Sequence, residues 1–194
     1  MKKNLVIAIL MTIATTVLLG IIYPLVVTGI AQVLFPKKAN GQLIEANGKV
    51  IGSRIIAQAF TAPGNFHPRP SAVNYDPTGS NGSQLGPTNQ KLLDRVKGDT
   101  ATLHAENPGA PVPIDLVTTS ASGLDPEITP AAAAFQVSRV AKARGINADQ
   151  VRELVSKHTE NRQWGFLGEA RVNVLELNLE LDKQFPGTKQ SKAK

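Results

Sequence analysis

The chain has 194 residues, a formal net charge of +6 and no cysteine. This length accommodates one domain of ordinary size together with a further segment, and the lack of cysteine excludes disulfides and thiolate-ligated metals. Aromatic residues make up only 5% of the chain, which argues against nucleic-acid binding, because nucleic-acid-binding surfaces combine clustered Lys and Arg with aromatic side chains.

The first segment in chain order is a long apolar run. Residues 5–34 contain no charged residue, whereas a helix needs only about 20 apolar residues to cross the hydrocarbon core of a bilayer. We therefore expect residues 1–36 to form a short N-terminal tail and a single transmembrane helix. A cleaved signal peptide is the alternative, but its apolar region is typically only about 7–15 residues long.

The second half of this run carries small and helix-bending residues. Gly20, Pro24 and Gly29 lie where a kink or a protruding helix end is expected. Small side chains also let another helix approach closely in lipid. We therefore predict that Gly20, Tyr23, Pro24 and Gly29 contact a partner.

The charges that flank the run do not fix its orientation. Lys2 and Lys3 precede it, and Lys37 and Lys38 follow it, so the positive-inside count is nearly balanced. We expect the short N-terminal flank inside the cytoplasmic membrane and the larger domain outside. The lack of cysteine fits either side, so the opposite orientation stays open.

A globular domain is predicted for residues 37–186. Residues 43–60 alternate apolar and polar side chains on both sides of Asn47-Gly48, which is the strongest short-range signal for a β-hairpin. Residues 61–89 are rich in Pro, Gly, Ser and Asn, and an ordered loop of this length is usually functional. A flexible linker is the alternative, but it has no use for large aromatic and charged side chains. We predict that this loop contacts a partner through Phe66, His67, Arg69 and Tyr75.

Helices dominate the rest of the predicted domain. The pattern favours a helix over residues 91–106 and another over residues 131–144. The second of these begins after an N-cap hydroxyl and a proline and ends at a glycine, and a capping box predicts a third helix directly after it. The residues that carry these signals are Thr129, Pro130, Gly145, Asn147 and Gln150.

Two further segments give weaker signals. Residues 112–119 predict a strand, although Asp115 interrupts the apolar pattern. In residues 172–182 leucines alternate with polar residues as in a half-buried strand, but Asn173 and Glu176 have the spacing of a capping box, so a helix is favoured over a strand. The basic tail, residues 187–194, is expected to be disordered. The predicted fold class is α+β, with one transmembrane helix, one mixed domain and a long ordered loop.

The chemistry-bearing motifs of common enzymes are missing from the sequence. There is no Walker A, GxGxxG, HExxH or GxSxG pattern. His67, His104 and His158 lie on different segments without the spacing of metal ligands. We therefore expect neither a metal site nor an enzyme that acts alone.

One stretch, VTTSASGLDP at residues 117–126, has the composition of a phosphate-binding loop. Hydroxyl side chains and a glycine follow an apolar run and lead towards a helix. However, the stretch lacks the lysine of a P-loop, and Asp125 would place a negative charge near a bound phosphate. A structural turn is favoured, and a direct nucleotide site and a protein-contact loop stay as alternatives.

A resemblance covers nearly the whole chain in order. Its motifs are FHPRPSAV in residues 66–73, LVTTSASGLDP in residues 116–126, QVSRVAKARG in residues 136–145 and VNVLELNL in residues 172–179. Together with Tyr23-Pro24 in the apolar run, this succession resembles the C subunit of the potassium-transporting Kdp-type ATPase.

The resemblance implies an accessory subunit in a bacterial cytoplasmic membrane. In that family one transmembrane helix and one globular domain accompany a channel-like subunit that conducts potassium and a P-type subunit that hydrolyses ATP. The present sequence has neither a DKTG phosphorylation motif nor a TVGYG-like filter. Its implied partners are therefore those two subunits and the lipid bilayer, and no cofactor is expected.

The resemblance also raises a second interpretation of the function. Members of the family are described as catalytic chaperones that raise the ATP affinity of the hydrolysing subunit. On that interpretation the segment Ser120 to Gly123, with Ser122, and the later Gln136 would bind the nucleotide, as in the signature of ABC transporters. A domain outside the membrane could not reach cytosolic ATP, so the two interpretations differ in the predicted side of the domain.

Overall fold

The computed structural model describes residues 1–46 and 48–186. The chain divides into two compact units between Ile51 and Gly52. The predicted basic tail of residues 187–194 lies outside the described residues, and so does Asn47 in the predicted hairpin turn.

The first unit begins with an uninterrupted helical run. It consists of α1 (Lys2–Val17), a π-helical turn η1 (Leu18–Ile22) and α2 (Tyr23–Leu34). The run of 33 residues is the one helix among the described residues that is long and apolar enough to cross a membrane. None of its side chains is buried within the chain, so the apolar surface is available to lipid or to another helix.

The π-helical turn lies where the sequence predicts a distortion. In an α-helix the ring of Pro24 would clash with the carbonyl group four residues earlier, which belongs to Gly20. The wider turn instead lets the Tyr23 N–H bond to the carbonyl oxygen of Leu18, five residues back. The helix therefore continues past the proline without a break.

A short helix and a hairpin follow. Helix α3 (Pro36–Ala39) precedes β1 (Leu43–Ala46) and β2 (Lys49–Ser53), which pair in a two-stranded sheet. The hairpin prediction is confirmed, and Gly48 has the positive φ, +72°, that such a turn requires. The second strand is shorter than predicted, because the chain turns after Ser53.

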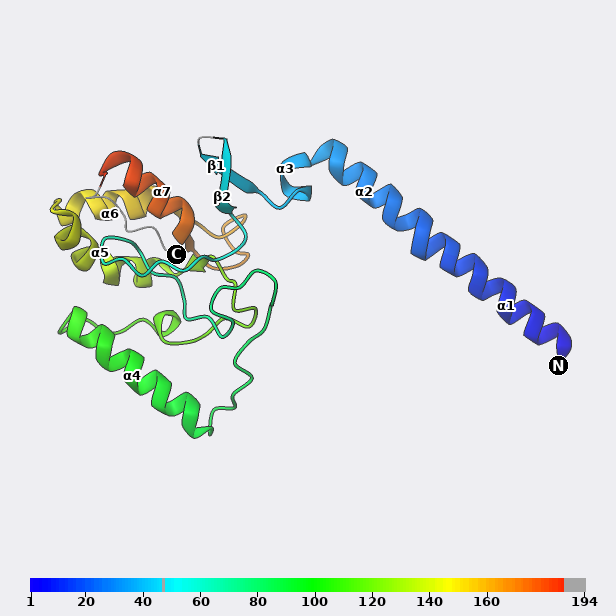
Figure 1. The fold of residues 1–194 in the computed structure, drawn as a ribbon, viewed down its shortest axis with the longest axis horizontal. Coiled ribbons are helices and arrows are strands. Elements are labelled where there is room, and N and C mark those ends of the chain that lie inside the picture. The colour runs from blue at the N-terminus through cyan, green and yellow to red at the C-terminus, as the bar shows by residue number, and fades with distance from the viewer. Residues whose placement is uncertain (47, 187–194) are drawn as a thin grey trace. The chain divides into compact units, whose positions relative to one another are not determined.

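The longest elements of the second unit are helices, joined by long loops, as Figure 1 shows. Helices α5, α6 and α7 lie together, and α4 stands apart with no buried residue. A small antiparallel sheet has the strand order β3-β5-β4. The predicted α+β class is confirmed. The elements are α4 (Gln90–Glu106), the 3₁₀ turn η2 (Ile114–Leu116), β3 (Glu127–Ile128), α5 (Pro130–Arg144), α6 (Ala148–Lys157), β4 (Thr159–Glu160), β5 (Arg171–Asn173) and α7 (Val174–Gln184).

Local signals place most of these helix ends. The Thr129 hydroxyl accepts a hydrogen bond from the Ala132 N–H and begins α5, and Gly145 ends it at φ +67°. The predicted capping box of Asn147 and Gln150 is present at the start of α6.

Two predictions about strands need correction. Residues 112–119 do not form a strand, because Asp115 is buried and its carboxylate accepts a hydrogen bond of 2.8 Å from the Thr129 N–H. That contact turns the chain into η2. Residues 172–182 combine both alternatives: β5 ends at Asn173, whose side chain then accepts a bond from the Glu176 N–H and begins α7.

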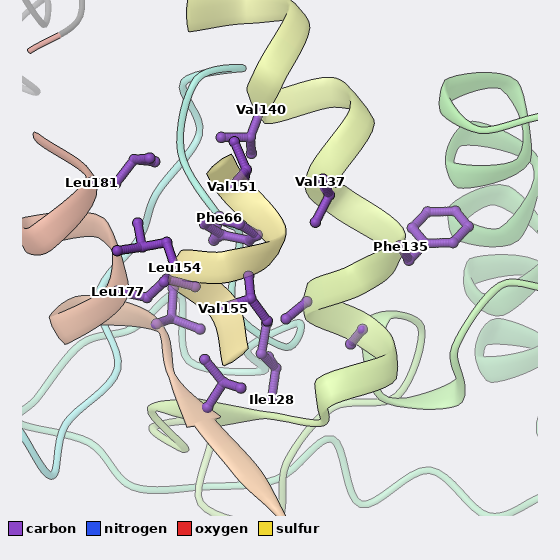
Figure 2. Close-up of a cluster of buried hydrophobic side chains, with 14 of the residues drawn as sticks. Phe66, Ile128, Phe135, Val137, Val140, Val151, Leu154, Val155, Leu177 and Leu181 are labelled. Atoms are coloured by element: carbon purple, nitrogen blue, oxygen red, sulfur yellow. The ribbon is translucent and has the colours of Figure 1, made fainter. Parts of the chain in front are cut away.

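The apolar core of the second unit lies between α5, α6 and α7. Figure 2 shows Phe66, from the long loop, among side chains of the helices such as Val151, Leu154 and Leu177. Phe66 has no exposed surface. The long loop is thus built into the core rather than laid over the surface.

Candidate functional site

The predicted contact loop, residues 61–89, is held by side-chain amides instead of by a neighbouring strand. Gln136 of α5 accepts a hydrogen bond from the His67 N–H at 2.8 Å and donates one to the His67 carbonyl oxygen at 3.1 Å. Asn178 of α7 does the same for Phe66, at 2.8 and 2.9 Å. A carboxamide carries both N–H donors and an acceptor oxygen, so a single amide can pair with the N–H and the carbonyl oxygen of one residue, as the neighbour in a paired strand does. The two amides therefore fix the loop backbone at consecutive residues.

Two arginines hold the adjacent part of the same loop. Arg139 donates to the carbonyl oxygens of Pro63 and Asn65, at 2.6 and 2.9 Å. Arg144 donates to the side-chain oxygen of Asn65 at 2.7 Å and pairs with Asp182. The bonds from Arg139 satisfy backbone carbonyl groups that a loop without secondary structure would otherwise leave unpaired.

The second half of the loop contacts the hydroxyl-rich stretch, residues 117–126. Asn81 donates from its N–H to the Ser122 carbonyl oxygen at 2.9 Å, and the Ser71 hydroxyl donates to the Gly123 carbonyl oxygen at 2.6 Å. The Ser71 oxygen also accepts a bond from the Tyr75 N–H. The two loops therefore order one another.

Gly123 is the tightest point of this contact. Its φ is +70°, and a Cβ atom there would lie 2.7 Å from the Val73 side chain and 2.8 Å from the Asn81 carbonyl oxygen. Real Cβ atoms do not approach other atoms so closely, and a left-handed backbone is strained for other residues. A glycine is therefore required by both conformation and space.

A cleft beside the hydroxyl-rich stretch carries more negative than positive groups. Arg69 pairs with Asp125 at 2.9 Å, and Arg171 pairs with Glu127 at 2.9 Å. Burial raises the pKa of Glu127 above its usual range. Asp115 and Glu169 also line the cleft. Because each arginine already faces a carboxylate, the cleft does not resemble a site for a phosphate.

The four residues proposed for a nucleotide are divided between two environments. Ser120, Ser122 and Gly123 share one loop, where the Ser122 hydroxyl accepts a bond from the Leu124 N–H. The amide of Gln136 is instead bonded to His67, and its side chain lies in the interior with 2% of the residue exposed.

The four residues proposed for partner contact are mostly inside the domain. Phe66 belongs to the core. His67 is partly buried, and burial together with the positive charge of Arg139 lowers its pKa. Arg69 pairs with Asp125, and the Tyr75 hydroxyl donates to the Arg69 carbonyl oxygen at 2.8 Å. Their contacts in the described part of the chain are with the fold itself.

The residues predicted to contact a partner from the membrane run lie on its exposed surface. Gly20, Tyr23, Pro24 and Gly29 are all exposed. A Cβ atom at Gly29 would have no neighbour within 4 Å, and one at Gly20 would meet only Thr16. The backbone is therefore open to a neighbouring helix at both glycines.

Sequence reasoning missed the residues that hold the long loop. Asn178, Arg139 and Arg144 were not singled out, and Asp115 counted only as an interruption of a strand. One signal was available: Asn178 lies between Leu177 and Leu181 on the face of α7 that is buried. A polar residue on the apolar face of a helix needs a specific hydrogen-bond partner.

The described residues contain no cluster of His, Asp and Glu that could hold a metal ion. A long apolar N-terminal helix followed by a small domain of interlocked loops is consistent with a single-pass membrane-anchored protein. The family model for the K+-transporting ATPase c chain, KdpC, matches residues 5–183. The chain therefore belongs to the KdpC family, the non-catalytic C subunit of that ATPase.

Individual relatives agree with this assignment over nearly their full length. The chain is 63% identical over 188 residues to a potassium-transporting ATPase KdpC subunit of Koribacter versatilis, covering 96% of this chain and 97% of that relative. It is 54% identical over 196 residues to one of Rhodopseudomonas palustris strain BisB18, covering 94% and 98%. A KdpC subunit of Methylobacterium nodulans is 50% identical over 197 residues, covering 94% and 98%.

Proposed function

We propose that this chain is an accessory subunit of a high-affinity, ATP-driven potassium uptake pump in a bacterial cytoplasmic membrane. It assembles with a channel-like potassium-conducting subunit and a P-type ATP-hydrolysing subunit and stabilises their complex. The apolar run crosses the membrane once, with the N-terminus inside and the domain outside.

The single observation that carries the proposal is the match to the KdpC family along almost the whole chain, residues 5–183. The structure adds an exposed apolar helix of 33 residues, which suits a membrane anchor. The interlocked loops add a second argument. They give the domain a preformed surface, which lowers the entropy lost on docking.

The exposed glycines of the run support a helix-packing role. Gly29→Leu should reduce co-purification of the chain with the other pump subunits, because a bulky side chain prevents close approach of two helices. Ala8→Leu is the matched control, since it adds a bulky side chain to another exposed position of the same run. Equal co-purification of both variants would indicate that the run anchors the chain in the membrane without packing against another subunit through Gly29.

The alternative function, a nucleotide-binding chaperone, is less well supported by the contacts. Nucleotide binding through Gln136 would have to break its two bonds to His67. Ser120 is buried as well, and the adjacent cleft is rich in carboxylates. We therefore infer that VTTSASGLDP is a structural connection from η2 to β3, which leads into α5.

The side of the membrane occupied by the domain is tested by cysteine labelling. The chain has no cysteine, so Ala101→Cys in the domain and Asn4→Cys at the N-terminal end of the helical run each give a single thiol at an exposed position. In intact cells a membrane-impermeant maleimide should label the domain thiol and leave the N-terminal thiol unlabelled. The reverse pattern would contradict the proposed orientation and reopen the nucleotide interpretation.

A further inference from the structure

A loop that the sequence analysis did not single out projects from the second unit between β4 and β5. All residues from 161 to 169 are exposed. We call this segment the aromatic loop. Gln163 and Leu167 exchange two backbone hydrogen bonds of 2.9 Å, and Trp164 and Gly165 turn the chain between them with φ values of +53° and +83°. The apex is therefore a defined turn.

The apex carries large apolar side chains and no charge. Trp164 is 85% exposed, Phe166 69% and Leu167 43%, and the two aromatic rings lie side by side with centroids 6.5 Å apart. The charges lie at the base, where Arg162 and Glu169 pair at 2.6 Å. An uncharged aromatic tip above a charged base matches the order of layers in a membrane interface, where Trp lies at headgroup level.

The base of the aromatic loop contacts the first residues of the second unit, which follow the membrane run in the chain. Arg54, near the start of this unit, pairs with Glu160 directly before the loop. The Asn173 side chain, after the loop, donates to the Arg54 carbonyl oxygen at 2.7 Å. Residues 35–53 join Leu34 to this point and reach at most about 70 Å even when fully extended. The chain itself therefore keeps the loop within reach of the membrane that holds the apolar run.

We propose that the aromatic loop inserts its apex into the lipid–water interface of the membrane that holds the apolar run. The proposal rests on the membrane anchoring stated above, and not on the pump partners. Insertion would give the domain a second membrane contact and restrict its rotation about the linker. The cost of association is small, because the tether already keeps the loop at a high effective concentration near the lipid.

The chain supplies its own probe, since Trp164 is its one tryptophan. The full-length chain is reconstituted in vesicles of phosphatidylcholine with either ordinary or dibrominated acyl chains. Both leaflets have the same composition, so the orientation of the chain does not affect the result. Insertion should shift Trp164 emission to the blue, and brominated lipid should quench it about twofold, because an indole at the interface lies beside the upper acyl chains.

Variants test whether the apex itself is responsible. Phe166→Ser combined with Leu167→Ser should abolish most of the quenching by brominated lipid. Ile114→Ser is the matched control, because Ile114 is an exposed apolar residue on another part of the unit, and it should leave the quenching unchanged. All of these positions are on the surface, and circular dichroism verifies the fold.

Two results would overturn the proposal. The first is a Trp164 emission that stays accessible to iodide and insensitive to brominated lipid while the chain floats with the vesicles. The second is a benzophenone at Trp164→Cys that, in the assembled pump, crosslinks to another subunit and not to lipid. Failure of the chain to float with vesicles would instead contradict the membrane anchoring in the proposed function.

Discussion

The amide of Gln136 gives the most direct test of whether the polar residues of the second unit build the domain or bind a nucleotide. In Gln136→Ala the His67 N–H and carbonyl group lose their partners at 2.8 and 3.1 Å. Each buried group left unpaired costs about 1–3 kcal/mol, so we expect a total loss of roughly 2–4 kcal/mol after partial rehydration. For a domain of this size each kcal/mol lowers the melting temperature by about 3–4 °C, which gives a decrease of about 6–16 °C.

The assay is thermal unfolding of the full-length chain in detergent, followed by circular dichroism. Ser138→Ala is the control, because Ser138 lies on the same helix but is exposed, and surface substitutions usually change stability by less than about 0.5 kcal/mol. Asn178→Ala should resemble Gln136→Ala, because it removes the equivalent bonds to Phe66.

The same variants are then assembled into the pump, and the apparent KM for ATP is measured. The structural role predicts a lower melting temperature and a KM that stays near that of the wild type in pumps that do assemble. A several-fold rise in KM for Gln136→Ala with an unchanged melting temperature would refute the reasoning and favour the nucleotide interpretation.

Three further predictions use the same unfolding measurement. Gly123→Ala should destabilise the domain by more than about 2 kcal/mol. Gly145 has a similar φ of +67° but no atom within 4 Å of its Cβ position, so Gly145→Ala should cost only about 1 kcal/mol of backbone strain. Equal losses of stability in the two variants would show that the crowding at Gly123 is unimportant. Ser122→Ala removes one hydrogen bond to the Leu124 N–H and should cost less than about 1.5 kcal/mol, so unfolding of the domain would show that the Ser122 hydroxyl contributes more to the fold than this one bond. Burial lowers the pKa of His67 in the folded chain, so the unfolded chain binds more protons and stability should fall as pH decreases below about 6.5; a melting temperature with the same pH dependence in His67→Gln would exclude this origin.

The sequence predicts well those features that depend on neighbouring residues. Thr129 begins α5, Gly145 ends it, and Asn147 begins α6, because an N-cap or a left-handed glycine acts within one turn of its own position. The hairpin around Gly48 and the membrane run follow from equally local patterns.

Features that depend on distant contacts could not be predicted in the same way. Asp115 bonds to Thr129 and His67 bonds to Gln136, and no local pattern announces either pair. The apolar character of residues 112–119 therefore predicted a strand, and Phe66 was assigned to a contact surface although it lies in the core. In both cases a tertiary contact decided the structure of a segment whose own preferences were weak.

Residues of the second unit differ in whether their side chains bond within the fold or face solvent. The long loop and the hydroxyl-rich stretch bond to helix side chains and to one another, through groups such as Gln136, Asn178 and Ser71. Substitutions there are expected to act first on folding, and any loss of pump activity would follow from that. The aromatic loop differs, because its apex directs Trp164 and Phe166 into solvent. Large exposed apolar side chains add little to folding stability. If their removal weakens membrane contact or pump assembly while the melting temperature stays unchanged, the aromatic loop is a surface that binds lipid or another subunit.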